Sequence, residues 1–320
     1  MMPLNQLYKM IGNHLSPAGQ NARLSILIYH RVLAEQDAIF PHEPTVKTFD
    51  AQISRLKKVF NVLPLAEAIT RLKSGTLPAR AVCITFDDGY ADNVTLALPI
   101  VQRWGLHATF FIATAYLDGG RMFNDTVIEA IRRSPLHTLI LDELGLGRFD
   151  IADNAAKGRA IDRILPQMKY LPLDVRERSV ARIADLAQSG SLPNDLMMTT
   201  EQLKTLHAAG MDIGGHTARH PILARLDRDA VLNEITEGRE FLEQTLNTRI
   251  RLFAYPNGKL GTDYLPEQAD IVRELGFDGA VSTQWGSSSQ SSDVFQLSRF
   301  TPWSPKPSRF VPVLFANLRR

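Results

Sequence analysis

Residues 81–90 read AVCITFDDGY. Six residues of mostly β-branched and apolar character predict a buried strand, which stops at two adjacent carboxylates, Asp87 and Asp88. Neighbouring carboxylates raise each other's pKa, and a divalent metal bound by one of them would relieve that repulsion. Asp-Gly is also a common turn dipeptide, so this stretch alone fits a surface turn equally well.

A second stretch, residues 214–221, reads GGHTARHP. His216 and His220 follow the short apolar segment 211–213, so they also lie at the end of a predicted strand. Imidazole suits zinc, and this spacing can bring both rings to one ion. Pro221 disfavours helical geometry at His220, which excludes the helical His-Glu-x-x-His signature. A histidine pair alone is a weak signal, but its combination with Asp-Asp at another strand end predicts a metal centre.

A third stretch, residues 251–258, reads RLFAYPNG and ends in a Pro-Asn-Gly turn. In this order, the three stretches resemble the polysaccharide deacetylases of carbohydrate esterase family four, whose shared region is the chitooligosaccharide deacetylase-like homology domain. The resemblance runs from about residue 26 to about residue 302. It implies a metal-dependent hydrolase that removes the N-acetyl group of an amino sugar.

The first two stretches contain the expected metal ligands and the expected catalytic base. Asp88, His216 and His220 are the expected ligands, and three protein ligands leave a position open for water. Zinc is the expected ion, although cobalt and nickel suit the same ligands. Asp87 is then free to act as the general base.

The 255–258 turn is expected to bind substrate and the oxyanion. The backbone N–H of Asn257 is the proposed oxyanion donor, at a position where the family usually has tyrosine, and Tyr255 is a second contact. Arg299 is a third residue of this group. Ala254 stands where many members have an arginine that orients the base, so either Arg299 or Arg251 is left to orient Asp87. Weaker candidates for contacts with sugar rings are Asp125, Trp285 and Trp303.

The general acid is expected at His30. Many family members supply this histidine from a Leu-x-His motif near the C-terminus, where this chain has Leu297, Ser298 and Arg299. The permuted branch of poly-N-acetylglucosamine deacetylases resembles this chain more closely, because its N-terminal Tyr-His pair matches Tyr29 and His30. The alternative is a structural histidine at a strand end.

The composition narrows the function classes. The chain has 320 residues, of which 44% are hydrophobic and 22% charged, with a formal net charge of +2 and one cysteine, Cys83. No basic run supports a nucleic-acid partner, and no intramolecular disulfide can form. No apolar segment is long enough to cross a bilayer, and the N-terminus lacks the pattern of a secretory signal. We therefore expect a soluble cytoplasmic protein, with a peripheral contact at the inner membrane face left open.

The chain alternates predicted strands and helices, which favours an α/β fold with a parallel sheet. The resemblance implies a distorted, incomplete (β/α) barrel made of residues 24–118 and 199–304. Residues 119–198 show helical patterns and no clear strand, so we expect a helical insertion over the C-terminal face of the barrel. Residues 1–23 form an N-terminal helical extension, and residues 305–320 are a C-terminal tail. Predicted strands include 24–30, 108–113 and 294–300, and Thr48 and Asp92 or Asn93 are predicted helix caps.

The expected substrate is an N-acetylated glycan or a lipid-linked oligosaccharide on a surface-polysaccharide pathway. One alternative is a hydrolase of another carbon–nitrogen amide bond, such as a deformylase or a cyclic-amide hydrolase. Another is a catalytically inactive carbohydrate-binding relative, against which the presence of Asp87 with all three ligands argues. The sequence specifies neither the sugar nor the oligomeric state.

Overall fold

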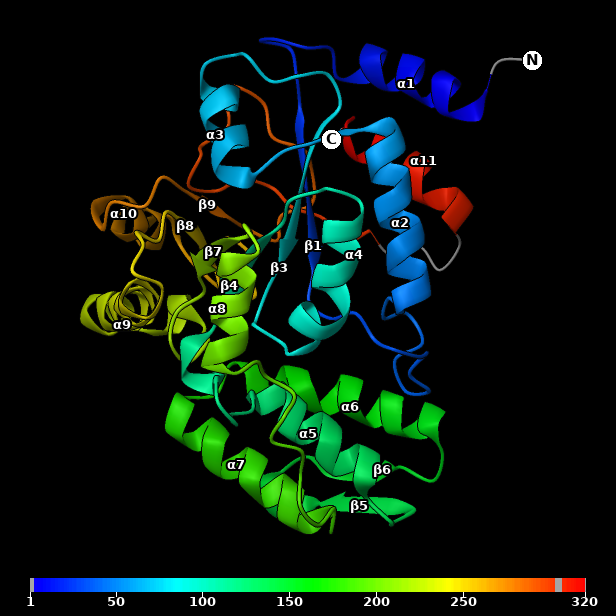
Figure 1. Ribbon diagram of the computed structural model, residues 1–320. Helices are drawn as coiled ribbons and strands as arrows, with labels where there is room; N and C mark the ends of the chain where they lie inside the picture. The colour runs from blue at the N-terminus through cyan, green and yellow to red at the C-terminus, as the bar shows by residue number, and fades with distance from the viewer. Residues whose placement is uncertain (1–2, 303–306, 320) are drawn as a thin grey trace.

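A curled parallel sheet forms the centre of the computed structural model, which describes residues 3–302 and 307–319 (Figure 1). Within these residues the sheet has seven strands in the order β1-β3-β4-β7-β8-β9, with β2 paired to β3. The strands are β1 (Leu24–Tyr29), β2 (Asn61–Val62), β3 (Ala81–Phe86), β4 (Thr109–Ile112), β7 (Asp212–Gly215), β8 (Leu252–Ala254) and β9 (Gly279–Val281). Because β1 and β3 are apolar along their length and buried on both faces, they pair in the middle of the core.

The two edges of the sheet are joined by an irregular segment instead of a strand. Leu297 forms a single parallel bridge with Val281 of β9, and Phe300 forms one with Leu27 of β1. The predicted strand at 294–300 is therefore wrong: the segment crosses from one edge strand to the other and cannot keep a ladder with either. The structure confirms the distorted, incomplete (β/α) barrel.

Helices cover the outside of the sheet, and each buries one apolar stripe. In α2 (Val46–Val59) the buried residues include Phe49, Ile53 and Leu56, spaced by three or four positions. The side chain of Thr45 caps α2, so the predicted cap at Thr48 was one turn too late. The other helices on the barrel are α3 (Leu65–Lys73), α4 (Leu98–Arg103), α8 (Thr200–Ala208), α9 (Arg228–Leu246) and α10 (Pro266–Glu274).

The segment after β3 differs from the predicted capped helix. A π-helical turn at Asn93–Ala97 precedes α4, and Asp92 makes no side-chain capping bond. The Asp92 carboxylate instead accepts hydrogen bonds from the Arg31 side chain at 2.8 Å and from the Val32 backbone at 3.1 Å. Asp92 therefore holds the loop after β1 in place through Arg31 and Val32, and its carboxylate does not cap the helix.

Residues 119–198 form the insertion, which lies beneath the C-terminal ends of β1 and β3 (Figure 1). It contains α5 (Phe123–Arg133), α6 (Asn154–Lys169) and α7 (Leu173–Leu186) around a separate apolar cluster, which Ile39 from the loop after β1 also joins. The prediction that it lacks strands was wrong, because β5 (Thr138–Leu141) and β6 (Gly147–Asp150) form an antiparallel hairpin. Every second side chain of β5 is buried, as expected for a strand. This alternation covers only four residues, and the helical patterns on either side of it obscured it.

The first and last helices pack together on the side of the barrel away from the insertion (Figure 1). Helix α1 (Leu4–Leu15) contacts α11 (Pro307–Asn317) through the edge-to-face rings of Tyr8 and Phe315. Phe310 and Leu314 of α11 are fully buried, so part of the expected tail at 305–320 packs as a helix. Trp303 lies outside the described residues. Among the described helices, none is both long and apolar enough to span a membrane.

Candidate active site

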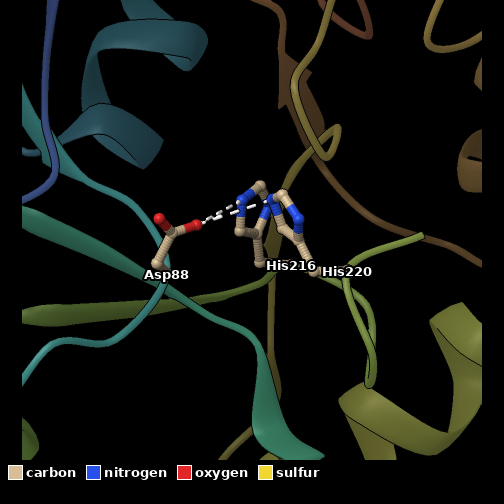
Figure 2. Close-up of side chains that lie close together, drawn as sticks. All are labelled: Asp88, His216 and His220. Atoms are coloured by element: carbon tan, nitrogen blue, oxygen red, sulfur yellow. Dashed lines mark ion pairs between the residues drawn. The ribbon is translucent and has the colours of Figure 1, made fainter. Parts of the chain in front are cut away.

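Three side chains from two strand ends meet at the C-terminal edge of the sheet. Asp88 follows β3, and His216 and His220 follow β7. The Asp88 Oδ1 atom lies 3.4 Å from His216 Nε2 and 3.5 Å from His220 Nε2. Figure 2 shows the carboxylate pointing toward both imidazole rings. The structure therefore brings the three predicted ligands together, although His216 is 128 positions from Asp88 in the chain.

The local backbone holds these side chains in place. Asp88, Thr217 and His220 adopt left-handed φ angles of 77°, 62° and 52°, which turn the chain sharply after each strand. His216 Nδ1 donates a 2.7 Å hydrogen bond to the carbonyl of Ala254, so its Nε2 lone pair faces Asp88. The His220 backbone N–H donates to Thr217 Oγ1 at 3.0 Å, which fixes the turn.

The geometry fits a tetrahedral metal ion. Two ligands bound at zinc distances lie roughly 3.4 Å apart. The observed separations of 3.4 and 3.5 Å match that edge and exceed ordinary hydrogen-bond lengths. The buried Nδ1 atom of His220 has no hydrogen-bond partner among the described residues, and its Nε2 atom is the one that faces Asp88. The ligand set Asp88, His216 and His220 therefore forms a candidate divalent-metal site.

The electrostatics favour the metal-binding forms of Asp88 and His220, whereas at His216 the effect of burial is outweighed by Asp88 and Asp87, which raise its pKa. Burial alone would raise the pKa of Asp88, but its contact with His216 and the nearby His220 hold that pKa well below its usual range. Burial and the neighbouring His216 lower the pKa of His220 to about 3, so this imidazole is neutral. An ionised carboxylate and a neutral imidazole are the forms that bind metal.

Replacing His216 with alanine should abolish metal binding, because it removes one of three protein ligands and the ring that orients the site. We expect purified wild-type protein to carry one divalent ion per chain by elemental analysis, and the His216→Ala protein almost none. His137→Ala, at an exposed position in the insertion, is the matched control and should keep the ion. Full metal content in His216→Ala would contradict the assignment.

Asp87 is held by Arg299 behind the metal ligands. Both Asp87 oxygens accept hydrogen bonds from the guanidinium, at 2.6 and 2.7 Å, and neither residue is more than 2% exposed. Arg299 is itself fixed by the Ser282 carbonyl and by Thr85 Oγ1. Burial raises the pKa of Asp87, but Arg299 outweighs it and keeps the carboxyl ionised. Asp87 Oδ2 lies 3.9 Å from His216 Nε2, beside the metal site.

Arg299 therefore occupies a different position from the one expected. It lies behind Asp87, is fully buried, and is not among the residues that line the cleft, so its expected role in binding substrate was wrong. It takes the orienting role that Ala254 cannot supply. Arg251, the other candidate, pairs with Asp278 at the surface.

The Pro-Asn-Gly turn places its two candidate residues differently. Asn257 lines the cleft and has a left-handed φ of 58°. Tyr255 points away: its ring stacks on Tyr264 at 3.9 Å, and its hydroxyl donates to the Phe295 carbonyl at 2.8 Å. The expected contact between the Tyr255 side chain and substrate was therefore wrong, because the outward direction of alternate strand residues places this ring in the core.

A cleft of about 700 Å³ connects these groups to the insertion. His30 follows β1, is exposed and lines this cleft together with the metal ligands and Asp87. Asp125 of α5 also lines it, whereas Trp285 is 51% exposed and is not among the lining residues. Sequence analysis missed lining residues from the loop after β1, from the turn after β3 and from the insertion, which include Glu43, Tyr90, Phe123, Lys169 and Tyr170.

Comparison with known proteins identifies the family. Residues 74–140 and 178–280 match the family described as polysaccharide deacetylase. The chain belongs to this family. Its members are hydrolases that act on the amide bond of N-acetylated sugars in polysaccharides, so the resemblance and the enzyme class expected from the sequence are confirmed.

Individual relatives of this deacetylase family are distant in sequence. The chain is 21% identical to the "Putative polysaccharide deacetylase YxkH" of Bacillus subtilis (strain 168) over 280 residues, covering 87% of this chain and 71% of that protein. The Streptococcus pyogenes deacetylase PplD, solved in complex with acetate, matches with a TM-score of 0.61 and 20% identity over 92% of this chain and 98% of that chain. IcaB from Ammonifex degensii matches with a TM-score of 0.58 and 18% identity over 95% and 99%.

Proposed function

We propose that this protein is a metal-dependent de-N-acetylase that hydrolyses the N-acetyl amide of an amino sugar in a polysaccharide or glycan precursor, with zinc as its ion. One observation carries the proposal: Asp88, His216 and His220 converge with tetrahedral spacing, and the Asp87–Arg299 pair lies beside them. Cobalt and nickel suit the same ligands and are the rival ions.

A bound divalent ion supplies a Lewis acid for the amide carbonyl and lowers the pKa of water toward neutrality. Asp87 then takes the proton of the attacking water, since Arg299 keeps its carboxyl ionised and correctly oriented. Because both Arg299 contacts are buried, the base is held in one orientation as charge develops. The two adjacent carboxylates after β3 would then have different roles, Asp88 as a metal ligand and Asp87 as the general base.

The other two groups act on the acyl oxygen and the leaving nitrogen. The Asn257 backbone N–H is the proposed donor to the oxyanion, a role that depends on the turn and not on the side chain. His30, across the cleft, is the proposed donor of a proton to the leaving amine. Both roles need the substrate to lie between β1 and the β8 turn.

The acetate bound to a structural relative is consistent with this reaction class. Acetate, present in the PplD complex, is the acid released when an N-acetyl amide is hydrolysed. The glycan is the remaining product, as a free amine. We further propose that the substrate is a lipid-linked oligosaccharide. The protein would act on it in the cytoplasm or at the inner membrane face.

The test is acetate release from a panel of N-acetylated oligosaccharides by the zinc-loaded protein. N-formylated analogues and cyclic amides serve as rival substrates. Preferential acetate release supports the de-N-acetylase, whereas turnover confined to a rival amide would replace it. Binding of the oligosaccharides without any turnover would instead identify an inactive carbohydrate-binding relative.

Replacing His30 with alanine should lower kcat about 10²-fold or more while metal content stays unchanged, because a general acid contributes that much and His30 is not among the metal-binding group. Steady-state acetate release and elemental analysis of the same preparation check it. His42→Ala, at a neighbouring exposed position, is the control. Selective loss of metal in His30→Ala would make His30 a ligand instead of an acid.

A further inference from the structure

Helix α1 carries an unusual share of the apolar side chains that reach the surface. Eight large hydrophobic side chains are exposed in the described part of the chain, and four of them belong to this one helix. Their exposed fractions run from 39% to 58%. We call these four residues the apolar stripe of α1; they are Leu4, Leu7, Met10 and Ile11. Single exposed hydrophobic residues are ordinary, but a group on one helix indicates an interaction surface.

The apolar stripe is separate from the face by which α1 attaches to the barrel. Tyr8, Gly12 and Leu15 face the protein: Gly12 is buried, and Tyr8 and Leu15 pack against the main apolar core. The members of the stripe follow one another at three or four positions, so they share a different face of the same helix. Folding of the described residues therefore leaves this second face uncovered.

The segments around α1 are known from its contacts. The Tyr8 ring packs on Phe315 of α11, and Phe315 also contacts Phe60 at the end of α2. The Ser16 carbonyl, just after α1, accepts a hydrogen bond from the backbone N–H of Arg80 at 3.1 Å. The surroundings of α1 are therefore α11, the end of α2 and the loop that leads into β3.

These same segments lack negative charge. Residues 1–34, 51–66, 68–80 and 294–320 contain none of the 34 acidic residues of the chain. Exposed cations do occur in them, and they include Lys9 on α1, Lys57 and Lys58 on α2, Lys73 on α3 and Arg319 after α11. Because the whole chain has a formal net charge of only +2, this end of the molecule is far more cationic than the rest. An apolar stripe surrounded by cations is complementary to an anionic lipid surface.

The apolar stripe and the metal site lie at opposite ends of the barrel (Figure 1). Arg80 immediately precedes β3, whereas Asp87 and Asp88 immediately follow it. A strand of six residues is roughly 20 Å long. A partner that covers α1 therefore leaves the active-site cleft open.

We propose that α1 binds the surface of a bilayer that contains anionic phospholipid. The helix lies in the plane of the interface, with its apolar stripe among the lipid chains and the surrounding lysines and arginines at the phosphate groups. The cleft then faces away from the bilayer, so that the reacting sugar is about the length of β3 or more from the headgroups. That last consequence rests on the proposed function, whereas lipid binding does not.

The test is co-sedimentation of the full chain with vesicles of two compositions. One contains phosphatidylcholine and phosphatidylglycerol in equal parts, and the other contains phosphatidylcholine alone. We expect the mixed vesicles to bind at least about tenfold more tightly at low salt, since each cation near the surface contributes about fivefold. High salt should remove most of this difference, because it screens the headgroup charge.

The double variant Leu7→Glu with Met10→Glu should bind the mixed vesicles about tenfold or more weakly, because it removes apolar contacts and adds repulsion. Both side chains are exposed, so the fold should be retained. Ile140→Glu with Phe241→Glu is the matched control. It makes the same change at two exposed hydrophobic positions on β5 and α9, and its vesicle binding should equal that of the wild type.

Three outcomes would overturn lipid binding by α1. The wild-type protein could bind neither vesicle, or the control variant could lose as much binding as the α1 variant. A dimer of the wild type that the α1 variant dissolves, with no vesicle binding, would make the apolar stripe a contact between two copies. Acetate release from short oligosaccharides without vesicles separates the proposals: normal release without vesicle binding overturns only this inference, and vesicle binding without release overturns only the proposed function.

Discussion

Replacing Asp87 with asparagine is expected to lower the rate of acetate release by about 10²- to 10⁴-fold, the usual contribution of a general base, while metal content stays at one ion per chain. Asparagine cannot take a proton from water, but it keeps the shape of the side chain and one acceptor for Arg299. The Asp88, His216 and His220 ligands are untouched by the change. Turnover and elemental analysis on one preparation give both numbers.

The adjacent carboxylate is the matched control. Asp88→Asn makes the same carboxylate-to-amide change at the neighbouring residue. Asp88 Oδ1, however, lies 3.4 and 3.5 Å from the Nε2 atoms of the two imidazoles. It should therefore lose metal and activity together. If Asp87→Asn also lost its metal, or if its turnover were unaffected, Asp87 would not be the base.

Replacing Arg299 with methionine should destabilise the fold by about 3–5 kcal/mol, because it leaves Asp87 as an uncompensated buried charge. The guanidinium has no exposed surface and makes two contacts with Asp87 below 2.8 Å. Solvent cannot replace those contacts in the folded state. The measurement is the free energy of unfolding in urea, with equal slopes required for the comparison.

Arg251→Met provides the comparison for this second change. Arg251 also pairs with an aspartate, Asp278, but its side chain is 52% exposed. A solvent-exposed pair contributes about 1 kcal/mol or less, so this variant should unfold close to the wild type. Equal losses in the two variants would show that Arg299 does not neutralise a buried charge.

Much of the site was predictable because strand ends are readable from local pattern. The apolar run before Asp87 and Asp88 and the short one before His216 each predicted a strand that stops at a polar group. In a parallel sheet such ends share one edge, so the three ligands were expected to meet. The tetrahedral spacing in the structure agrees with that expectation.

Contacts between segments that are distant in the chain could not be predicted from local sequence patterns. Arg299 was one of two arginines that could orient Asp87, and only the irregular crossing of residues 297–300 from β9 to β1 places it behind that carboxylate. The direction of the Tyr255 ring likewise depends on a distant segment, because its hydroxyl donates to the Phe295 carbonyl. The β5–β6 hairpin was hidden because its strands are only four residues long.

The sequence by itself determined the α/β class, the strand ends that carry the metal ligands and the base, and the family to which the chain belongs. These features depend on residue order over a few positions, where hydrophobic periodicity and covalent spacing act directly. Tertiary structure alone decided that Arg299 neutralises Asp87, that Tyr255 belongs to the core, and that Asp125 of the insertion faces the cleft. Those outcomes depend on which surfaces become buried against each other, and burial sets both the direction of a side chain and its charge.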